Sequence, residues 1–74
     1  MKLNTIYRTV EEITPIPQFT GTNLDNRKTP FKVGTDFWID SVNNGVVVVE
    51  SKSGSKYSFL EDEFSASTEL INGE

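Results

Sequence analysis

The clearest alternation of apolar and polar positions lies in the second half of the chain. Phe37 and Ile39 alternate there with Asp36, Trp38 and Asp40. A period of two residues is typical of a strand with two different faces. The pattern therefore predicts a strand in which Phe37 and Ile39 point to one side and Trp38 points to the other.

Two turn signals divide this half into a three-stranded antiparallel meander over residues 35–60. Asn43-Asn44-Gly45 supplies residues that tolerate positive φ, which favours a tight hairpin. Ser53-Gly54 marks the second turn. After the first strand, the meander is expected to continue with strands at residues 46–51 and 56–60.

Shorter elements are predicted at the two ends of the chain. Residues 2–10 mix β-branched and aromatic residues in an imperfect alternation, which indicates a first strand. Residues 61–64 are too short and too acidic for a strand and predict a single helical turn, with Phe64 pointing inward. Residues 68–71 predict a short final strand that would close the sheet.

A long loop, residues 11–34, separates the first strand from the meander. It contains three prolines and a stretch rich in turn-forming residues at 21–29, so no long helix fits. Segments of this length without secondary structure are usually functional or disordered. Because apolar residues recur along the loop, we expect it to fold back onto the domain. These residues are Ile13, Ile16, Phe19, Leu24 and Phe31.

Four consecutive valines, residues 46–49, place two β-branched side chains on each face of their strand. The valine side chains on both faces then need to be shielded from water by other parts of the protein. One interpretation is a bent strand that contributes to the core on one side and is covered by loop 11–34 on the other. The alternative is an exposed patch of Val47, Val49 and Trp38 that serves self-association or the docking of a partner.

The order of these elements resembles the SH3-like β-barrel over nearly the whole chain. The resemblance implies an all-β, small five-stranded barrel with a long loop after the first strand. Residues 31–39 look like the "apolar, x, x, Gly, x, x, aromatic" start of the second strand in small bacterial and phage barrels. The chain lacks the Ala-Leu-Tyr-Asp-Tyr run and the paired tryptophans of the eukaryotic peptide-binding SH3 domains, so binding of proline-rich peptides is not implied. The rival architecture is a five-stranded OB-like barrel.

Composition limits both size and chemistry. The chain has 74 residues, enough for one small domain over residues 1–74, and a formal net charge of -4. It contains neither Cys nor His, which removes disulfides, thiolate nucleophiles, imidazole bases and the usual zinc ligands. A chain of this size rarely gains more than about 3–5 kcal/mol from one core. A homo-oligomer or a stable partner complex is therefore as reasonable an expectation as a free-standing monomer.

Candidate catalytic and metal-binding groups are weak. Residues 61–63 are consecutive acids that cannot all point at one cation. The carboxylate pairs available for acid-base work, such as Asp36 with Asp40, need a cleft that a barrel of this size hardly provides. No base is placed to activate a serine or threonine. We therefore expect no enzyme activity, no metal site and no cofactor.

Binding of a single-stranded nucleic acid or a nucleotide is an alternative, because small β-barrels stack bases on exposed aromatic side chains. Trp38 with Tyr7 or Tyr57 could form such a platform, and Arg27-Lys28 with Lys32 makes a local basic spot. The other basic residues are scattered and outnumbered by acids, so the basic surface that such binding needs is missing.

These observations favour a non-enzymatic protein-protein interaction module. The chain is similar in style to the small accessory proteins with which phages and mobile elements inhibit or redirect host proteins. It lacks a secretory signal and a membrane-spanning stretch, so we expect a cytoplasmic protein, in the host cytoplasm if a phage encodes it. A structural subunit of a larger assembly is a further alternative. The expected partner-binding residues are Phe19, Asn23, Arg27, Lys28, Trp38, Val47 and Val49.

Overall fold

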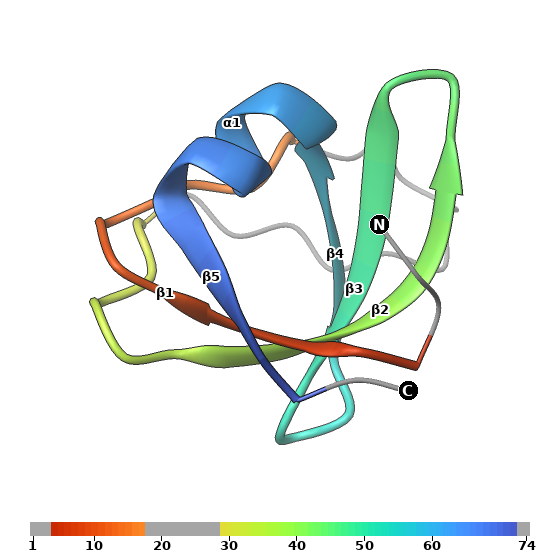
Figure 1. The fold of residues 1–74 in the computed structure, drawn as a ribbon. Helices are drawn as coiled ribbons and strands as arrows, with labels where there is room; N and C mark the ends of the chain where they lie inside the picture. Colours follow the sequence, from red (N-terminus) through yellow and green to blue (C-terminus); the bar gives the residue numbers. More distant parts are fainter. Residues whose placement is uncertain (1–3, 18–28, 73–74) are drawn as a thin grey trace.

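The computed structural model describes residues 4–17 and 29–72, and these form one antiparallel sheet of five strands with one short helix (Figure 1). The strands lie in the order β4-β3-β2-β1-β5. This confirms the predicted all-β class and the order of elements. The elements are β1 (Ile6–Thr9), β2 (Asp36–Asn43), β3 (Val46–Ser51), β4 (Lys56–Leu60), α1 (Glu61–Ser67) and β5 (Thr68–Asn72).

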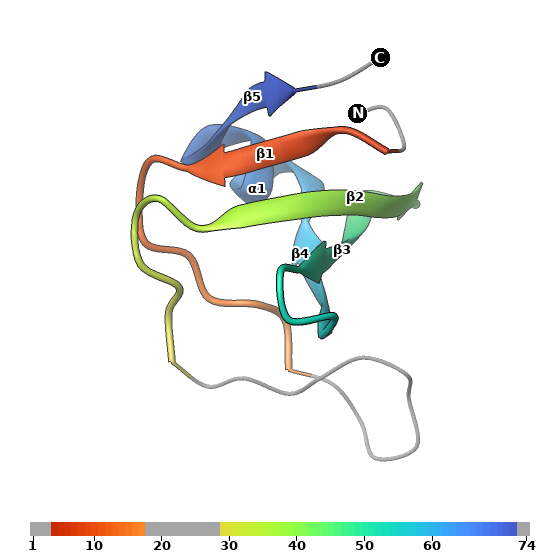
Figure 2. The same ribbon diagram turned by 90° about the horizontal axis from the view of Figure 1, so that it is seen from below.

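Strand β2 is the centre of the sheet and joins its two halves. Its first residues pair with β1, whereas its whole length from Phe37 to Asn43 pairs with β3. The register between β2 and β3 shifts between Ile39 and Ser41, which leaves Asp40 as an extra residue. Such a bulge bends a strand and increases its twist. β1 lies beside the first half of β2 and carries β5 on its other side (Figure 2).

The bulge also changes which residues of β2 point inward. Phe37 and Ile39 are buried as the alternation predicts, but beyond the bulge the inward position passes to Val42, which packs against the core. Val42 lies opposite Val47, and Ile39 lies opposite Val49. Directly opposite residues share a face, so both valines of β3 also point inward.

The hairpin between β2 and β3 turns at the predicted residues. Asn44 and Gly45 have φ values of 51° and 77°, and Asn43 pairs with Val46 across the turn. Positive φ at both central residues matches the right-handed twist of the flanking strands. The sequence signal for this hairpin is confirmed in type and position.

The core is built mainly from four phenylalanine rings that contact one another. The ring centroids of Phe31 and Phe37 lie 4.8 Å apart, and those of Phe59 and Phe64 lie 5.2 Å apart. Phe37 also contacts Phe59, at 5.6 Å. Edge-on and tilted contacts of this kind stabilise aromatic pairs beyond the burial of their surface.

Helix α1 covers one end of the curved sheet and places Phe64 in the core (Figure 1). It is longer than the predicted turn at residues 61–64, because no glycine or proline interrupts Ser65-Ala66-Ser67. The helix ends at Thr68, where the backbone becomes extended. The hydroxyl of Thr68 donates a hydrogen bond of 2.6 Å to the carbonyl oxygen of Phe64 and so satisfies one end group of the helix.

The described parts of loop 11–34 pack onto the sheet, as expected. Ile13 and Phe31 are buried and form an isolated bridge, in which the N–H of Phe31 donates to the carbonyl of Ile13 at 2.8 Å. Farther along, the N–H of Ile16 donates to the carbonyl of Ser58 in β4 at 2.8 Å. Phe19 and Leu24, the other apolar residues expected to pack, lie outside the described residues.

Thr9 fixes the end of this loop to β1. Its buried hydroxyl donates to the carbonyl of Lys32 at 2.8 Å and accepts from the N–H of Thr35 at 2.9 Å. Its own backbone accepts from the N–H of Gly34 at 2.9 Å. Residues 32–35 are thereby held against the point where β2 begins.

Candidate functional site

Trp38 occupies the outer face of the sheet, on the opposite side from the core. It lies opposite Ile6 of β1 and Glu50 of β3, and it is partly exposed. We predicted that Val47 and Val49 would be its neighbours, and this is wrong. Both valines are fully buried on the inner face, so they cannot contact a partner in the folded domain.

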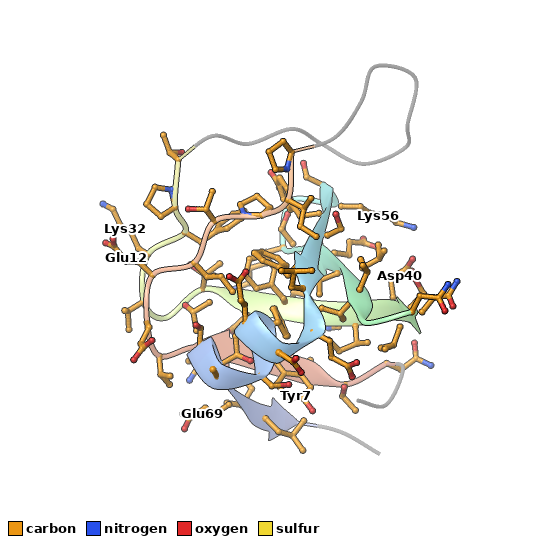
Figure 3. All side chains as sticks on the ribbon, turned by 90° about the horizontal axis from the view of Figure 1, so that it is seen from above. Tyr7, Glu12, Lys32, Asp40, Lys56 and Glu69 are labelled. Atoms are coloured by element: carbon orange, nitrogen blue, oxygen red, sulfur yellow. The ribbon has the colours of Figure 1, made fainter. Side chains whose placement is uncertain are left out.

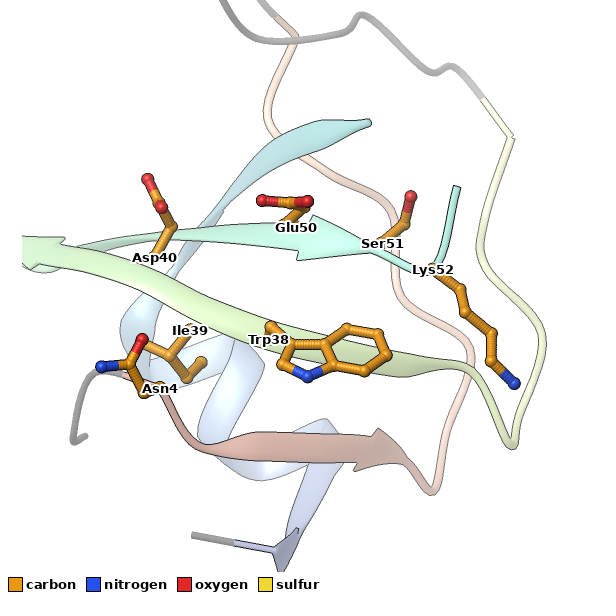
Figure 4. Close-up of a pocket in the computed structure, with 7 residues that line it drawn as sticks. All are labelled: Asn4, Trp38, Ile39, Asp40, Glu50, Ser51 and Lys52. Carbon is orange, nitrogen blue, oxygen red and sulfur yellow. The ribbon is translucent and has the colours of Figure 1, made fainter. Parts of the chain in front are cut away.

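A hollow of about 330 Å³ lies beside the indole of Trp38. Figure 4 shows the indole extended along β2, with the carboxylates of Asp40 and Glu50 on one side of it and the ammonium of Lys52 beyond its far edge. The hollow is open to solvent and belongs to the surface rather than to the interior. Its lining residues are Asn4, Trp38, Ile39, Asp40, Glu50, Ser51 and Lys52.

The two carboxylates beside Trp38 are not equally compensated. The Nζ of Lys56 lies 3.5 Å from Oδ2 of Asp40, and Figure 3 shows these two side chains on the side of the molecule away from Lys32 and Glu12. Lys56 also lies opposite Glu50 in the register of β3 and β4. Within the described part of the chain, however, the carboxylate of Glu50 makes neither an ion pair nor a hydrogen bond. The hollow therefore has one carboxylate that no cation of the described chain engages.

At the other end of the outer face, Arg8 and Asp36 form a two-bonded ion pair between β1 and β2. The Nε and Nη2 atoms of Arg8 donate to the two carboxylate oxygens of Asp36 at 2.8 and 3.2 Å. The hydrogen bond from Arg8 holds the pKa of the Asp36 carboxyl below its ordinary value of 3.8. Glu69 of β5 lies opposite Arg8 on its other side. At this end of the face, the positive charge of Arg8 is thus compensated by two flanking carboxylates.

A second hollow, of about 360 Å³, adjoins the first at Ser51 and Lys52, which line both. It lies between the segment before β2 and the turn after β3, and Phe31 and Tyr57 contribute its aromatic lining. Tyr57 is partly exposed, and its ring lies 4.9 Å from that of Phe31. We refer to the two hollows together, by their shared lining residues, as the Trp38–Tyr57 tract. The second hollow is lined by Phe31, Gly34, Thr35, Asp36, Ser51, Lys52, Ser53 and Tyr57.

The structure brings together only part of the predicted binding surface. Phe19, Asn23, Arg27 and Lys28 lie outside the described residues, and Val47 and Val49 belong to the core. Trp38 is the one predicted residue that the structure places on an exposed hollow.

The aromatic platform considered for nucleic acid does not form around Trp38. Tyr7 lies opposite Phe37, which places it on the inner face, where its ring lies 5.8 Å from that of Phe64. Tyr57 lies opposite Val49 and packs against Phe31. Neither tyrosine is therefore beside Trp38 on the outer face.

Sequence reasoning missed Asp40, Glu50, Ser51 and Lys52 as neighbours of Trp38. Their signal lies in the strand register rather than in residue type. Counting outward from the Asn44-Gly45 turn without a bulge would set Trp38 opposite Ser51. The bulge at Asp40 moves the register by one residue and sets Glu50 there instead.

The described residues show no group of three or more acidic side chains that could hold a metal ion. Within these same ranges, every buried side-chain nitrogen and oxygen has a hydrogen-bond partner. No helix in the described part of the chain is long and apolar enough to cross a membrane. A scan against protein-family models gave no match, and neither did searches of curated proteins and of solved structures.

Proposed function

We propose that this chain is a non-enzymatic protein-protein interaction module that binds its partner along the Trp38–Tyr57 tract. The observation that carries the proposal is the position of Trp38. A large aromatic side chain is partly exposed beside an open hollow, although its chain neighbours Phe37 and Ile39, on the opposite face of the same strand, are buried. Aromatic side chains in hollows are the residues on which protein interfaces concentrate their binding energy.

The form of the tract supports a protein segment as the ligand. Trp38 lines one hollow, Phe31 and Tyr57 line the other, and the polar residues Ser51 and Lys52 line both. An interface with apolar anchors and a polar rim has this composition. A phage-encoded inhibitor or adaptor of a host protein, the type of protein that the sequence resembles, would act through such a surface.

The charges of the outer face favour a protein over a nucleic acid. Its three basic residues, Arg8, Lys52 and Lys56, are outnumbered by four acidic ones, Asp36, Asp40, Glu50 and Glu69. A nucleic-acid interface needs an excess of positive charge to neutralise phosphates. We therefore do not propose the nucleic-acid alternative.

Affinity capture from a nuclease-treated cell lysate tests the proposal. We expect one protein in near-stoichiometric amount that survives a moderate salt wash. Trp38→Ala should abolish its capture. Ser53→Tyr, which places a bulky side chain at an exposed position of the second hollow, should weaken capture while leaving the core intact.

Leu60→Ala is the matched control, because it removes an exposed apolar side chain that lines neither hollow. Circular dichroism of each variant shows whether it is folded. Absence of an enriched protein, or capture by both tract variants at the level of the parent, would overturn the proposal.

A further inference from the structure

We infer that the hollow beside Trp38 receives a basic side chain, arginine or lysine, from the partner protein. The inference rests on the proposed function and names the chemistry of the group that the partner inserts. Three features carry it: the open face of the indole, the two carboxylates beside it, and the lack of a cation on Glu50 within the described chain.

The indole of Trp38 is the first part of the recognition. The negative face of an aromatic ring attracts a guanidinium or ammonium group, and tryptophan does so most strongly. The methylene groups of a long basic side chain would at the same time cover the apolar indole surface. The partly exposed ring thus suits both the charge and the stem of such a side chain.

The carboxylates supply the second part. Figure 4 shows Asp40 and Glu50 on the same side of the indole, and both line the hollow together with Trp38. Lys56 reaches Asp40 only at 3.5 Å, and the carboxylate of Glu50 has no ion pair or hydrogen bond within the described residues. A guanidinium group could therefore donate hydrogen bonds to Glu50 without displacing an ion pair of the described chain.

Lys52 sets the direction in which the basic side chain enters. Its ammonium lies beyond the far edge of the indole and lines both hollows. It would repel a second cation from that end and leave the side of Asp40 and Glu50 as the favourable one. Reversing this charge should therefore strengthen the binding of a cation rather than weaken it.

The single tryptophan of the chain provides a direct readout, because the indole N–H signal in a nitrogen-proton correlation spectrum belongs to Trp38 alone. The probe is a short capped peptide, Gly-Ser-Arg-Ser-Gly, added to millimolar concentration. The comparison peptides carry lysine, citrulline or glutamate in place of arginine. Citrulline has nearly the shape of arginine without its charge.

We expect a saturable shift of the indole signal with the arginine and lysine peptides and none with the citrulline and glutamate peptides. The double variant Asp40→Asn, Glu50→Gln should bind the arginine peptide about fivefold more weakly, and Lys52→Glu should bind it more tightly. The control is Asp62→Asn, Glu63→Gln, which makes the same change in net charge on α1 and should bind like the parent.

Equal responses to arginine and citrulline, or equal losses in the two double variants, would overturn the inference. A shift of the indole signal with protein concentration alone would also overturn it, since the occupant would then be a second copy of the chain. If lysate capture depends on Trp38 but not on Asp40 and Glu50, the proposed function stands and only the basic side chain is wrong. If capture is independent of Trp38 as well, both fail.

Discussion

The two faces of strand β2 differ in how deeply they bury their aromatic side chains. On the inner face, Phe37 is fully buried among other aromatic rings. One residue later, Trp38 lies on the outer face between Ile6 and Glu50 and remains partly exposed. The larger aromatic side chain is thus the one that the core does not use. We therefore expect Phe37 to act in the stability of the domain and Trp38 to act in the binding that we propose.

The interactions on the two faces also differ in kind. The inner face is held mainly by apolar contacts, together with buried hydrogen bonds such as those of Thr9, whereas the outer face carries ion pairs such as that between Arg8 and Asp36. Exposed ion pairs contribute little to folding because water screens them. We therefore expect changes on the inner face to alter stability and changes on the outer face to alter binding.

The largest effect is expected from Phe37→Ala. Removing a buried phenylalanine side chain costs about 3–5 kcal/mol in transfer and cavity terms. A single core of this size contributes a net stability of about 3–5 kcal/mol. The variant should therefore be largely unfolded at 25 °C in circular dichroism and urea titrations. Leu60→Ala, at a position 47% exposed, should stay within about 0.5 kcal/mol of the parent. A folded Phe37→Ala protein with a loss below about 1 kcal/mol would contradict this account of the core.

Thr9→Val should have the next largest effect. The substitution keeps the shape of the side chain but leaves the N–H of Thr35 and the carbonyl of Lys32 without the hydroxyl that they contact. The carbonyl of Lys32 still accepts from the hydroxyl of Thr35 at 2.6 Å, so the N–H of Thr35 is the group that loses its partner, at a cost of about 1–3 kcal/mol. The free energy of unfolding from urea titration measures this loss. Thr9→Ser retains the hydroxyl and should lose clearly less, so equal losses in the two variants would show that the hydrogen bonds are not the cause.

Trp38→Ala tests the comparison between the two faces most directly. Because the indole is only partly buried, we expect a loss near 1 kcal/mol, well below that of Phe37→Ala, together with loss of partner capture. Urea titration and the lysate capture described above are measured on the same protein. If Trp38→Ala destabilised the domain as strongly as Phe37→Ala, Trp38 would act as a core residue. The expectation that the outer face acts in binding rather than in stability would then be wrong.

The sequence predicted the strands of the meander well. The strands at residues 46–51 and 56–60 agree with the sequence, because β-branched and aromatic residues lie there between clear turn residues. The apolar residues of loop 11–34 predicted that the loop packs onto the domain, and Ile13 and Phe31 are buried there. The bulge at Asp40 has no comparable signal, since any residue type can occupy it. Without it, neither the inward position of Val42 nor the contact between Trp38 and Glu50 follows from the pattern.

The hydrogen bonds of Thr9 were likewise invisible in the sequence. A threonine within a predicted strand indicates β-propensity, and its type does not reveal whether the hydroxyl meets solvent or a distant backbone. The hydrogen-bond partners of Thr9, Lys32 and Thr35, follow it by more than 20 residues, at the C-terminal end of loop 11–34. Contacts of this range depend on how the loop closes. The site residues around Trp38 were missed for the same reason, because tertiary register determines them.

The smallest expected effect is a pH dependence from Asp36. The hydrogen bond from Arg8 lowers the pKa of this carboxyl in the folded protein below its ordinary value of 3.8. The ion pair therefore stabilises the folded state fully above that value, and its contribution is lost as the pH falls through the lowered pKa. Asp36→Asn should be less stable than the parent at about pH 7, and the difference should close at about pH 2. Urea titrations at both pH values measure this difference in the free energy of unfolding.

The control is Glu12→Gln, at an exposed carboxylate without an ion pair among the described residues. It should show no such convergence between the two pH values. A difference in the free energy of unfolding that persists unchanged in acid would mean that Asp36 stabilises the domain through packing rather than charge. Packing on the outer face would then also contribute to stability.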